Sequence, residues 1–345
     1  MPQATSPADA ESRAPSVSVA LCTHNGAAFV GEQVRSILDQ VPAPQELVVG
    51  DDASTDDTVA IVERAVARHR AEHPTAAVSL RVLRRERALG VTANFDSTIA
   101  ACSGDIVALS DQDDVWPPGR LARLLPLFDD PRVSLVHTDA RLVDADGRDT
   151  GARLLATLEA TGDERARLQR GEALPALLRR NLVTGATVLV RRELARRAAP
   201  FPAAWVHDEW LAIMAAVEGG LRLVDEPWLD YRQHGANVIG ASEVTWSRRW
   251  ERLREPRDER AARLIARTEA LVERLERIGG RPEAVAAARA KLEHERRRSR
   301  LPRWQPLRVP GVLAGALAGR YTRYSRGAID VLRDLVQPAT RSAGR

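Results

Sequence analysis

The sequence predicts an α/β protein in which a mixed, mostly parallel sheet is flanked by helices and followed by a helical, basic C-terminal extension. From residue 17 onward, short β-branched or apolar runs alternate with helical patterns, which is typical of βα units around a parallel sheet. Charge also divides the chain, because residues 241–345 carry 25 Lys and Arg against 13 Asp and Glu, whereas residues 1–240 carry 26 against 34. We therefore expect an acidic body that holds the chemistry and a basic extension that contacts an anionic surface.

Apolar runs that end in polar residues predict the strands, and helical patterns lie between them. The predicted strands span residues 17–22, 46–50, 78–83, 105–110, 133–144 and 181–190. The predicted helices span about 28–40, 58–70, 90–102 and 208–220, the last ending on a glycine pair. Beyond residue 240, apolar residues spaced three and four apart predict a helical hairpin that breaks at "IGGRP".

Three polar clusters follow strands of the predicted sheet: "THNG" after the first, "DDASTDD" after the second and "DQDD" after the fourth. In an open α/β sheet, ligands bind outside the carboxyl ends of the strands, where the loops converge. We therefore expect the three clusters to meet in one crevice.

The carboxylates Asp111, Asp113 and Asp114 end the fourth strand. Grouped hard oxygens suit Mg²⁺ or Mn²⁺, and Mg²⁺ is usually held by one or two carboxylates together with substrate phosphates. Alternatively, these acids could simply begin the helix that follows "PPGRL". The pair Asp51 and Asp52 has a similar ambiguity, since "DDASTDDT" can cap a helix, but adjacent acids in a crevice can also accept hydrogen bonds from the sugar or base of a nucleotide.

In combination the motifs are more specific. The order and spacing of "VSVALCTHNG", "ELVVGDDASTDDT" and "ALSDQDDVW" resemble the family 2 glycosyltransferases, whose GT-A fold is Rossmann-like. "SDQDDVW", "VHDEWLA" and "YRQHGANVIG" are most similar to the bacterial rhamnosyltransferase-like branch, which builds surface polysaccharide. The resemblance covers roughly residues 16–240, and it implies a GT-A-like domain there.

The resemblance implies roles at the matching positions. Contacts to the nucleotide sugar would come from the loops after the strands and from the following helix: Thr23, His24, Asn25, Asp51, Asp52, Asn94, Asp111 and Gln112. Asp111 and Asp113 would hold a divalent cation, Mn²⁺ or Mg²⁺, with Asp114 and His234 as further contacts. Asp208 would be the general base and its neighbour Glu209 a rival. Relatives often carry Asn at the place of Ala88, so this chain departs from the family pattern there.

Two of these positions have a plainer interpretation as well. The dipole of a helix favours an acid such as Asp208 in its first turn, and His234 could be a loop histidine satisfied by hydrogen bonds.

The implied reaction is an inverting, metal-dependent transfer of a sugar, with rhamnose favoured, from a dTDP- or UDP-sugar to a growing cell-surface glycan or a lipid-linked acceptor. One alternative is a sugar nucleotidyltransferase. That class of enzyme uses a Gly-rich phosphate-binding loop with a basic residue, and "CTHNGAAF" does not match such a loop well. Another is a non-catalytic scaffold for glycan assembly, against which the intact acids at 51, 52, 111, 113 and 208 argue.

The extension is strongly basic, with 12 cations against 2 acids in residues 296–345. It predicts either an amphipathic segment in peripheral contact with an anionic membrane, or a solvated basic helix packed on the catalytic body. Nucleic acid is not expected as a partner, because the crevice is acidic and the extension has no interleaved stacking platform.

Residues 1–15 are predicted to be a disordered leader. They do not show the basic, then apolar, then small-residue segments of a secretory signal. The longest apolar run, 309–319, has 11 residues, well short of the ~20 that a membrane span requires. Cys22 and Cys102 lie in or beside apolar segments and are expected to be reduced. We therefore expect a cytoplasmic protein that the extension would bring to the inner face of the plasma membrane.

Overall fold

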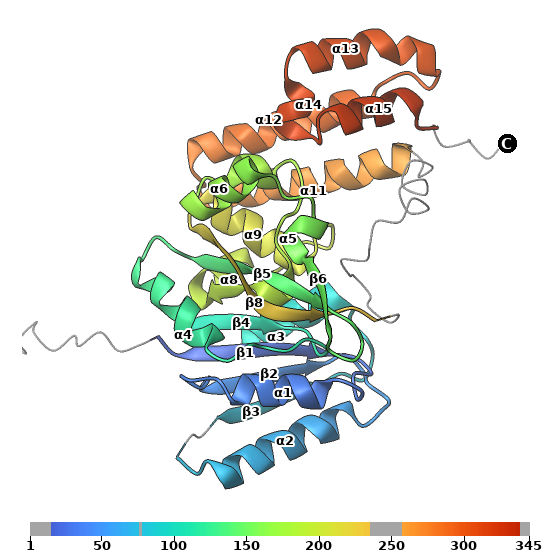
Figure 1. Ribbon diagram of the computed structural model, residues 1–345. Helices are drawn as coiled ribbons and strands as arrows, with labels where there is room; N and C mark the ends of the chain where they lie inside the picture. Colours follow the sequence, from blue (N-terminus) through green and yellow to red (C-terminus); the bar gives the residue numbers. More distant parts are fainter. Residues whose placement is uncertain (1–14, 76–77, 235–256, 339–345) are drawn as a thin grey trace, which may run out of the picture.

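The computed structural model describes residues 15–75, 78–234 and 257–338, and one eight-stranded sheet with helices on both faces forms its centre (Figure 1). The strand order is β3-β2-β1-β4-β7-β5-β6, and β8 pairs with β5 outside this path. The strands are β1 (Val17–Thr23), β2 (Glu46–Asp51), β3 (Ser79–Arg84), β4 (Ile106–Ser110), β5 (Leu135–Val143), β6 (Asp149–Arg153), β7 (Leu189–Arg191) and β8 (Leu221–Arg232). The predicted mixed, mostly parallel sheet flanked by helices is confirmed.

The direction of the strands sets where the loops meet. β3, β2, β1 and β4 are parallel neighbours, and β7 runs antiparallel to both β4 and β5. β5 therefore points the same way as β4, and β8 pairs with it in parallel. As a result, the carboxyl ends of β1, β2, β4, β5 and β8 all lie at one edge of the sheet.

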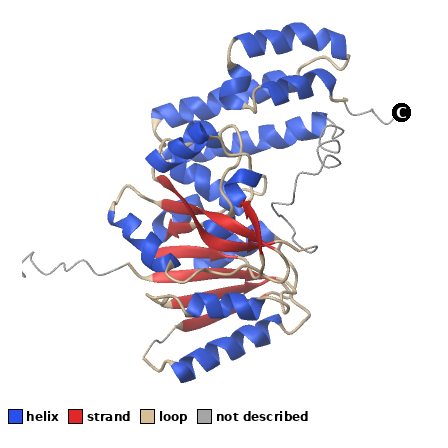
Figure 2. Ribbon diagram, viewed as in Figure 1, coloured by secondary structure: helices blue, strands red, loops and turns tan. Residues whose placement is uncertain are grey.

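Helices cover both faces of the sheet (Figure 2). In the first 234 residues they are α1 (Val30–Leu38), α2 (Thr58–Glu72), α3 (Val91–Ala101), α4 (Arg120–Leu124), α5 (Leu154–Thr157), α6 (Gly162–Arg170), α7 (Leu174–Leu177), α8 (Arg192–Ala198) and α9 (His207–Val217), with 3₁₀ turns η1 (Leu125–Asp129) and η2 (Gly185–Thr187). The extension contributes α11 (Arg257–Arg277), α12 (Pro282–Ser299), η3 (Gln305–Arg308), α13 (Val309–Leu317), α14 (Arg320–Tyr324) and α15 (Ala328–Val336).

Alternate residues of each central strand point to opposite faces, and each face has its own apolar core. In β1, Val19 and Leu21 pack with α1, α2 and α4, whereas Ala20 packs on the other face with α3, α8 and α9. The central strands are buried on both faces, which is why they are apolar runs in the sequence.

The C-terminal helices are stacked beyond α9, at the end of the molecule farthest from α2 and β3 (Figure 1). α11 and α12 form the predicted hairpin, whose connection includes Gly279 at a φ of 65°. Leu271 and Leu275 of α11 and two alanines of α12 are buried in the same core as α9. The first two helices of the extension are thus an integral layer on the body. The predicted leader and the predicted boundary near residue 240 lie outside the described residues, apart from Pro15, so this division of the chain stays a prediction.

The prediction of a strand over residues 181–190 is largely wrong. Only Leu189–Arg191 pairs in the sheet, and the chain turns through η2 just before it. Position 185 in this turn requires glycine, because an added Cβ would lie 2.6 Å from Nε2 of His207. The apolar run reflects burial beneath α9 and not strand pairing, and periodicity alone does not separate the two.

Among the residues that the structure describes, no helix is both long and apolar enough to cross a bilayer. Cys22 and Cys102 are free thiols, as expected.

Gly50, near the end of β2, is a position where even one methyl group should destabilise the fold. An added Cβ would lie 1.9 Å from Thr98 Oγ1 and 2.7 Å from Asn94 Oδ1. We expect Gly50→Ala to lower the free energy of unfolding by about 1–3 kcal/mol through overpacking, measured by urea denaturation. Gly162→Ala is the matched control, because its Cβ would meet nothing within 4 Å. Equal stability of the two variants would contradict the packing described here.

Candidate active site

Asp51 joins the loop after β1 to the loop after β2. The hydroxyls of Thr23 and Ser54 donate to Asp51 Oδ1 over 2.8 and 2.6 Å, and the Ser54 N–H donates to Oδ2 over 3.1 Å. Asp51 is buried, so these three donors stabilise its charge. Two of the loops predicted to bind a nucleotide are therefore held together by one carboxylate.

Asp52 and Asn94 join β2 to α3 and to the loop that precedes it. Asp52 accepts the N–H groups of Leu89 and Gly90 over 2.6 and 2.9 Å, one at each carboxylate oxygen. Asn94 donates from Nδ2 to the carbonyl of Gly50 over 2.7 Å. Both side chains are buried and bond the protein's own backbone.

Gln112 connects the first loop to the acidic loop after β4. Its Oε1 accepts the N–H of His24 over 2.8 Å, and its Nε2 donates to the carbonyl of the same residue over 3.1 Å. The closeness of this contact requires glycine at position 26, where a Cβ would lie 2.2 Å from Gln112 Oε1. Asn25, at a φ of 49°, accepts the N–H of Thr55 over 2.9 Å. The predicted residues 23–25, 51, 52 and 112 thus form one connected set of loops.

Four carboxylates lie close enough to influence one another at the crevice. Burial, followed by the charges of Asp113 and Asp208, raises the pKa of Asp111 to about 7. Burial and the charges of Asp113 and Asp111 raise the pKa of Asp114 well above its usual range. The hydroxyl of Tyr231 is next to this group, and burial and the charges of all four acids raise its pKa. The sheet edge therefore concentrates negative charge in a region of low dielectric.

Arg232, at the end of β8, is the residue that holds the acidic loop. It is buried, its N–H donates to Asp114 Oδ1 over 3.0 Å, and its Nε donates to the carbonyl of Asp113 over 2.8 Å. Its remaining nitrogens reach the carbonyl of Ala145 and the carboxylate of Glu32 over 2.9 and 2.7 Å. Sequence reasoning missed Arg232 and Tyr231, although both belong to the "YRQHG" motif.

Within the predicted metal set, Asp113 and His234 are in direct contact, with 2.8 Å between Oδ2 and Nε2. The His234 ring stacks on Phe29 at a centroid distance of 4.7 Å. Asp114 points elsewhere, because it is 1% exposed and one of its oxygens bonds the backbone of Arg232. Asp113 and His234 are thus the two members of the set that the structure brings into direct contact.

Asp208 and Glu209, the two candidates for the base, have different surroundings. Asp208 Oδ2 accepts the N–H of Gly185 in η2 over 2.9 Å, and burial raises its pKa to about 6. Glu209 forms an ion pair with Arg267 of α11, and the Arg267 guanidinium also lies over the ring of Trp205 at 4.2 Å. The indole N–H of Trp205 donates to the carbonyl of Arg267 over 2.8 Å. Glu209 therefore fastens the extension to α9, and no motif in the sequence indicated this contact.

The donor set fits a divalent cation. Asp111 and Asp113 offer hard oxygens. Burial and then the charge of Asp113 raise the pKa of Asp111, and a bound cation would offset both effects. Within the described ranges, no three His, Cys, Asp or Glu side chains enclose a metal site by themselves. A cation here would complete its coordination with phosphate oxygens and water, as Mg²⁺ usually does.

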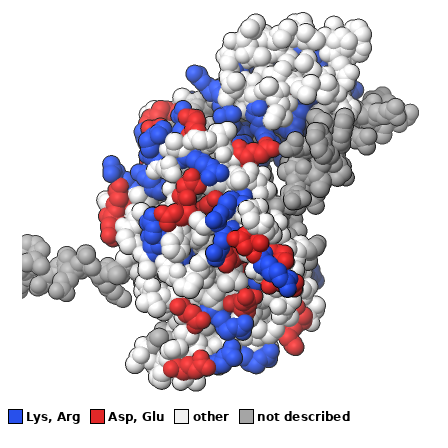
Figure 3. Space-filling view, in the orientation of Figure 1, with Lys and Arg blue, Asp and Glu red and all other residues white. Residues whose placement is uncertain are grey.

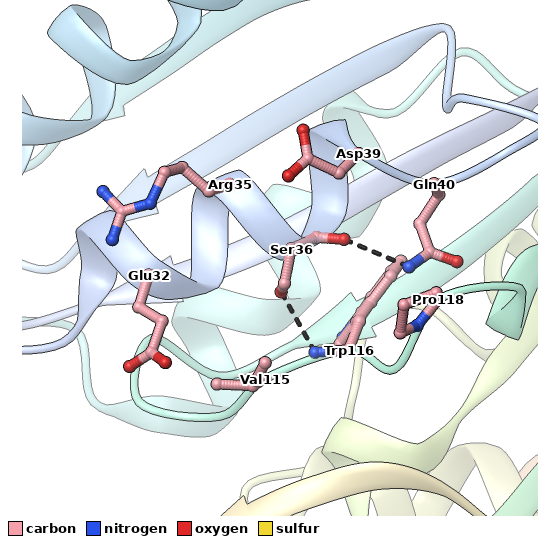
Figure 4. A pocket seen from close by; sticks show the side chains of 8 residues that line it. All are labelled: Glu32, Arg35, Ser36, Asp39, Gln40, Val115, Trp116 and Pro118. Carbon is pink, nitrogen blue, oxygen red and sulfur yellow. Dashed lines mark hydrogen bonds between the residues drawn. The ribbon is translucent and has the colours of Figure 1, made fainter. Parts of the chain in front are cut away.

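A separate pocket of about 290 Å³ lies between α1 and the segment that follows the acidic loop (Figure 4). Glu32, Ser36 and Gln40 of the α1 region line one side, and Val115, Trp116 and Pro118 line the other. The N–H of Trp116 donates to Ser36 Oγ over 3.0 Å and closes the pocket floor. None of the predicted site residues lines this pocket, so it is distinct from the crevice.

Comparison with protein families matches residues 18–195 to the model described as "Glycosyl transferase family 2". The match includes the loops at 23–25, 51–52 and 111–114, whereas Asp208 and His234 lie beyond it. An uncharacterized protein of Mycobacterium bovis is 27% identical over 229 residues, which cover 64% of this chain and 60% of that protein. The succinoglycan biosynthesis protein ExoO of Rhizobium meliloti is 27% identical over 231 residues, covering 64% of this chain and 61% of that protein. The alignments thus span about three fifths of these relatives.

Two solved structures share the fold. The mannosyltransferase PcManGT from Pyrobaculum calidifontis, in complex with GDP-Man and Mn²⁺, has a TM-score of 0.50 and 23% identity, covering 89% of this chain and 77% of that one. Staphylococcus aureus TarS 1–349 in complex with UDP-GlcNAc has a TM-score of 0.50 and 16% identity, covering 92% of this chain and 89% of that one.

The ion pair between Arg267 and Glu209 should contribute measurably to stability. The Glu209 side chain is 16% exposed, so Arg267→Gln leaves a largely buried carboxylate without its partner. We expect a loss of about 2 kcal/mol in the free energy of unfolding, and a coupling of about 1 kcal/mol with Glu209→Gln in a double-mutant cycle. Arg277→Gln is the control, because its pair with Glu273 is 61% and 70% exposed and should be worth less than about 0.5 kcal/mol. The same loss from both arginine variants would show that α11 is not fastened at this point.

Proposed function

Since this chain belongs to glycosyl transferase family 2, we propose that it transfers a sugar from a nucleoside-diphosphate sugar to a hydroxyl of an acceptor glycan, with inversion at the anomeric carbon. The observation that carries the proposal is the convergence of Asp111, Asp113 and Asp208 on one crevice at the carboxyl edge of the sheet. Asp111 and Asp113 come from the loop after β4, whereas Asp208 comes from the first turn of α9. An inverting transfer needs anion-handling groups at the leaving diphosphate and a base at the acceptor.

The base and ribose of the donor would lie against the loops at Thr23–Asn25 and Asp51. These loops are held as one unit by Asp51 and Gln112, which favours binding because little has to be ordered when the nucleotide arrives. Asp52 would act through the loop before α3, whose backbone it holds, and Asn94 would act through the end of β2, where it bonds the Gly50 carbonyl.

Asp113, Asp111 and His234 would hold a divalent cation, Mn²⁺ or Mg²⁺, together with the diphosphate of the donor. When bound, the cation would neutralise the charge that develops on the departing nucleoside diphosphate. His234 would orient the Asp113 carboxylate, with which it is in contact, and Arg232 would hold the loop that carries it. Asp114 is proposed as a structural anchor for Arg232 instead of a metal ligand.

Asp208, and not Glu209, would be the general base. Glu209 is neutralised by Arg267, whereas the Asp208 carboxylate accepts hydrogen bonds from the backbone N–H groups of Gly185 and Glu209. Asp208 would accept the proton of the acceptor hydroxyl as the new C–O bond forms and the bond to the diphosphate breaks.

The resemblance to the rhamnosyltransferase-like branch and one named relative support a proposal for donor and acceptor. ExoO is named for succinoglycan biosynthesis, which supports a surface polysaccharide or its lipid-linked precursor as the acceptor. We propose rhamnose from a dTDP-sugar, with a UDP-sugar as the second candidate, and a place of action at the cytoplasmic face of the plasma membrane. The family match favours this reaction over nucleotidyl transfer and over a non-catalytic scaffold.

Donor hydrolysis by the purified protein tests the proposal. Across a panel of nucleotide sugars with Mn²⁺ or Mg²⁺, we expect release of one nucleoside diphosphate, abolished by EDTA. Asp113→Ala should lower the rate at least ~10²-fold, because charge stabilisation of the leaving group is lost. Asp146→Ala is the control, since this exposed acid pairs with Arg148 on the surface. Nucleotide binding without any turnover of donor, with or without acceptor glycans, would refute the transferase proposal.

Asp208→Asn should lower kcat by ~10²–10⁴-fold while donor affinity is retained, because it removes only the proton acceptor. Glu209→Gln should change kcat far less, and its main effect should be on stability. Initial rates with acceptor, together with nucleotide titrations, separate the two. A larger kcat loss in Glu209→Gln would reverse the assignment.

The pKa of Asp208, about 6, sets the expected pH dependence. The base must be unprotonated, so kcat/KM should fall as pH falls through about 6 and should level off above about 7. The measurement is kcat/KM from pH 5 to 8 at saturating metal. A profile that is flat over this range would argue against an unprotonated Asp208 as the base.

A further inference from the structure

The exposed apolar side chains of this protein are concentrated at its C-terminal end. The described residues expose twelve large apolar side chains, of which eight lie between residues 304 and 336. These eight are Trp304, Leu307, Val309, Leu313, Leu317, Ile329, Leu332 and Val336. We call residues 304–336, which comprise η3 and α13–α15, the C-terminal cap.

The apolar residues form outward faces on ordered helices. Leu313 and Leu317 are four residues apart on α13 and are 51% and 89% exposed. Ile329, Leu332 and Val336 follow helical spacing on the outer side of α15. α13 and α15 contact each other and both contact η3, so these faces belong to one structural unit.

Hydrogen bonds fix η3 against the end of α15. Gln305 Nε2 donates to the carbonyl of Val336 over 2.7 Å, and the buried Arg308 donates to the carbonyls of Asp334 and Gln337 over 3.1 and 2.7 Å. Trp304 and Leu307 are therefore held next to Val336, and the exposure of this group is a property of the folded cap.

The cap exposes Arg323 and half-exposes Arg320, and it exposes no acid. Its two acids, Asp330 and Asp334, are buried and pair internally, Asp334 with Arg298 and Asp330 with Arg260. Arg320 and Arg323 both belong to α14, which contacts α13 and α15, the helices that carry the apolar faces. Figure 3 shows the surface over α13 as almost entirely uncharged, with arginines gathered along its lower margin.

We propose that the C-terminal cap docks on an anionic lipid leaflet, with its apolar side chains in the interfacial region and its arginines against the headgroups. Exposed Leu, Ile and Trp side chains beside cationic residues are the combination by which interfacial helices bind anionic membranes. The proposal deepens the proposed function, because it places the enzyme on the surface where a lipid-linked acceptor would be found.

Charge distinguishes this occupant from two others. In a symmetric dimer the same patch would face itself, so the arginines of the cap would meet identical arginines and no exposed acid of the cap. A soluble polyanion would satisfy the arginines but would leave the eight apolar side chains in water. Only a surface that is both apolar and anionic matches the whole cap.

Flotation of the full chain with lipid vesicles tests the proposal. We expect binding to vesicles of phosphatidylglycerol and phosphatidylethanolamine and little binding to pure phosphatidylcholine. Leu313→Asp/Leu317→Asp should weaken partitioning at least ~10-fold, and Arg320→Glu/Arg323→Glu should weaken it most at low salt. Val41→Asp is the matched control, since Val41 is 78% exposed on the catalytic body. Circular dichroism verifies that the variants are folded.

Three results would overturn the proposal: no flotation with either vesicle, equal loss in the Val41→Asp control, or a dimer in light scattering that the leucine variants dissociate while vesicle binding is absent. Donor hydrolysis is measured in parallel without lipid and should be unchanged in the leucine variants. Vesicle binding without donor hydrolysis in the wild type would refute the proposed function and leave the docking surface standing.

Discussion

The arrangement of this protein depends on how it tolerates several carboxylates in a buried crevice. Asp111, Asp113, Asp114 and Asp208 raise one another's pKa values or that of Tyr231, and like charges in a low dielectric are costly. Arg232 compensates by bonding the acidic loop through both its side chain and its backbone. The negative charge that remains would attract a cation to the crevice.

Much of the fold could be predicted from the sequence because the central strands are buried on both faces. β1, β2 and β4 are apolar runs that end in polar residues, and the edge at which they meet follows from their parallel order. β6 carried no such signal, since all five of its residues are exposed and show no alternation. α6 did carry one, the capping box of Thr161 and Glu164, which a closer search for helix starts would have found.

For the candidate site, the sequence predicted which residues take part but not the contacts that each of them makes. Acidic motifs identify Asp51, Asp52, Asp111 and Asp113, but the partners of each side chain depend on tertiary contacts. That Gln112 bonds the backbone of His24, 88 residues away, has no sequence signature. Likewise, Asp52 is suited by its chemistry to a sugar hydroxyl or to a backbone N–H, and only the path of the chain at Leu89 and Gly90 selects the latter.

The contact between Glu209 and Arg267 has a consequence for the evolution of such chains. The residue that neutralises Glu209 comes from α11, beyond the part of the sequence that matches the family model, while Glu209 itself adjoins the candidate base. The C-terminal helices therefore cannot be exchanged between relatives as an independent module. A recombination event near residue 250 would take α9, which carries the candidate base, from one parent and the counter-charge of Glu209 from the other, so the two segments are expected to be inherited together.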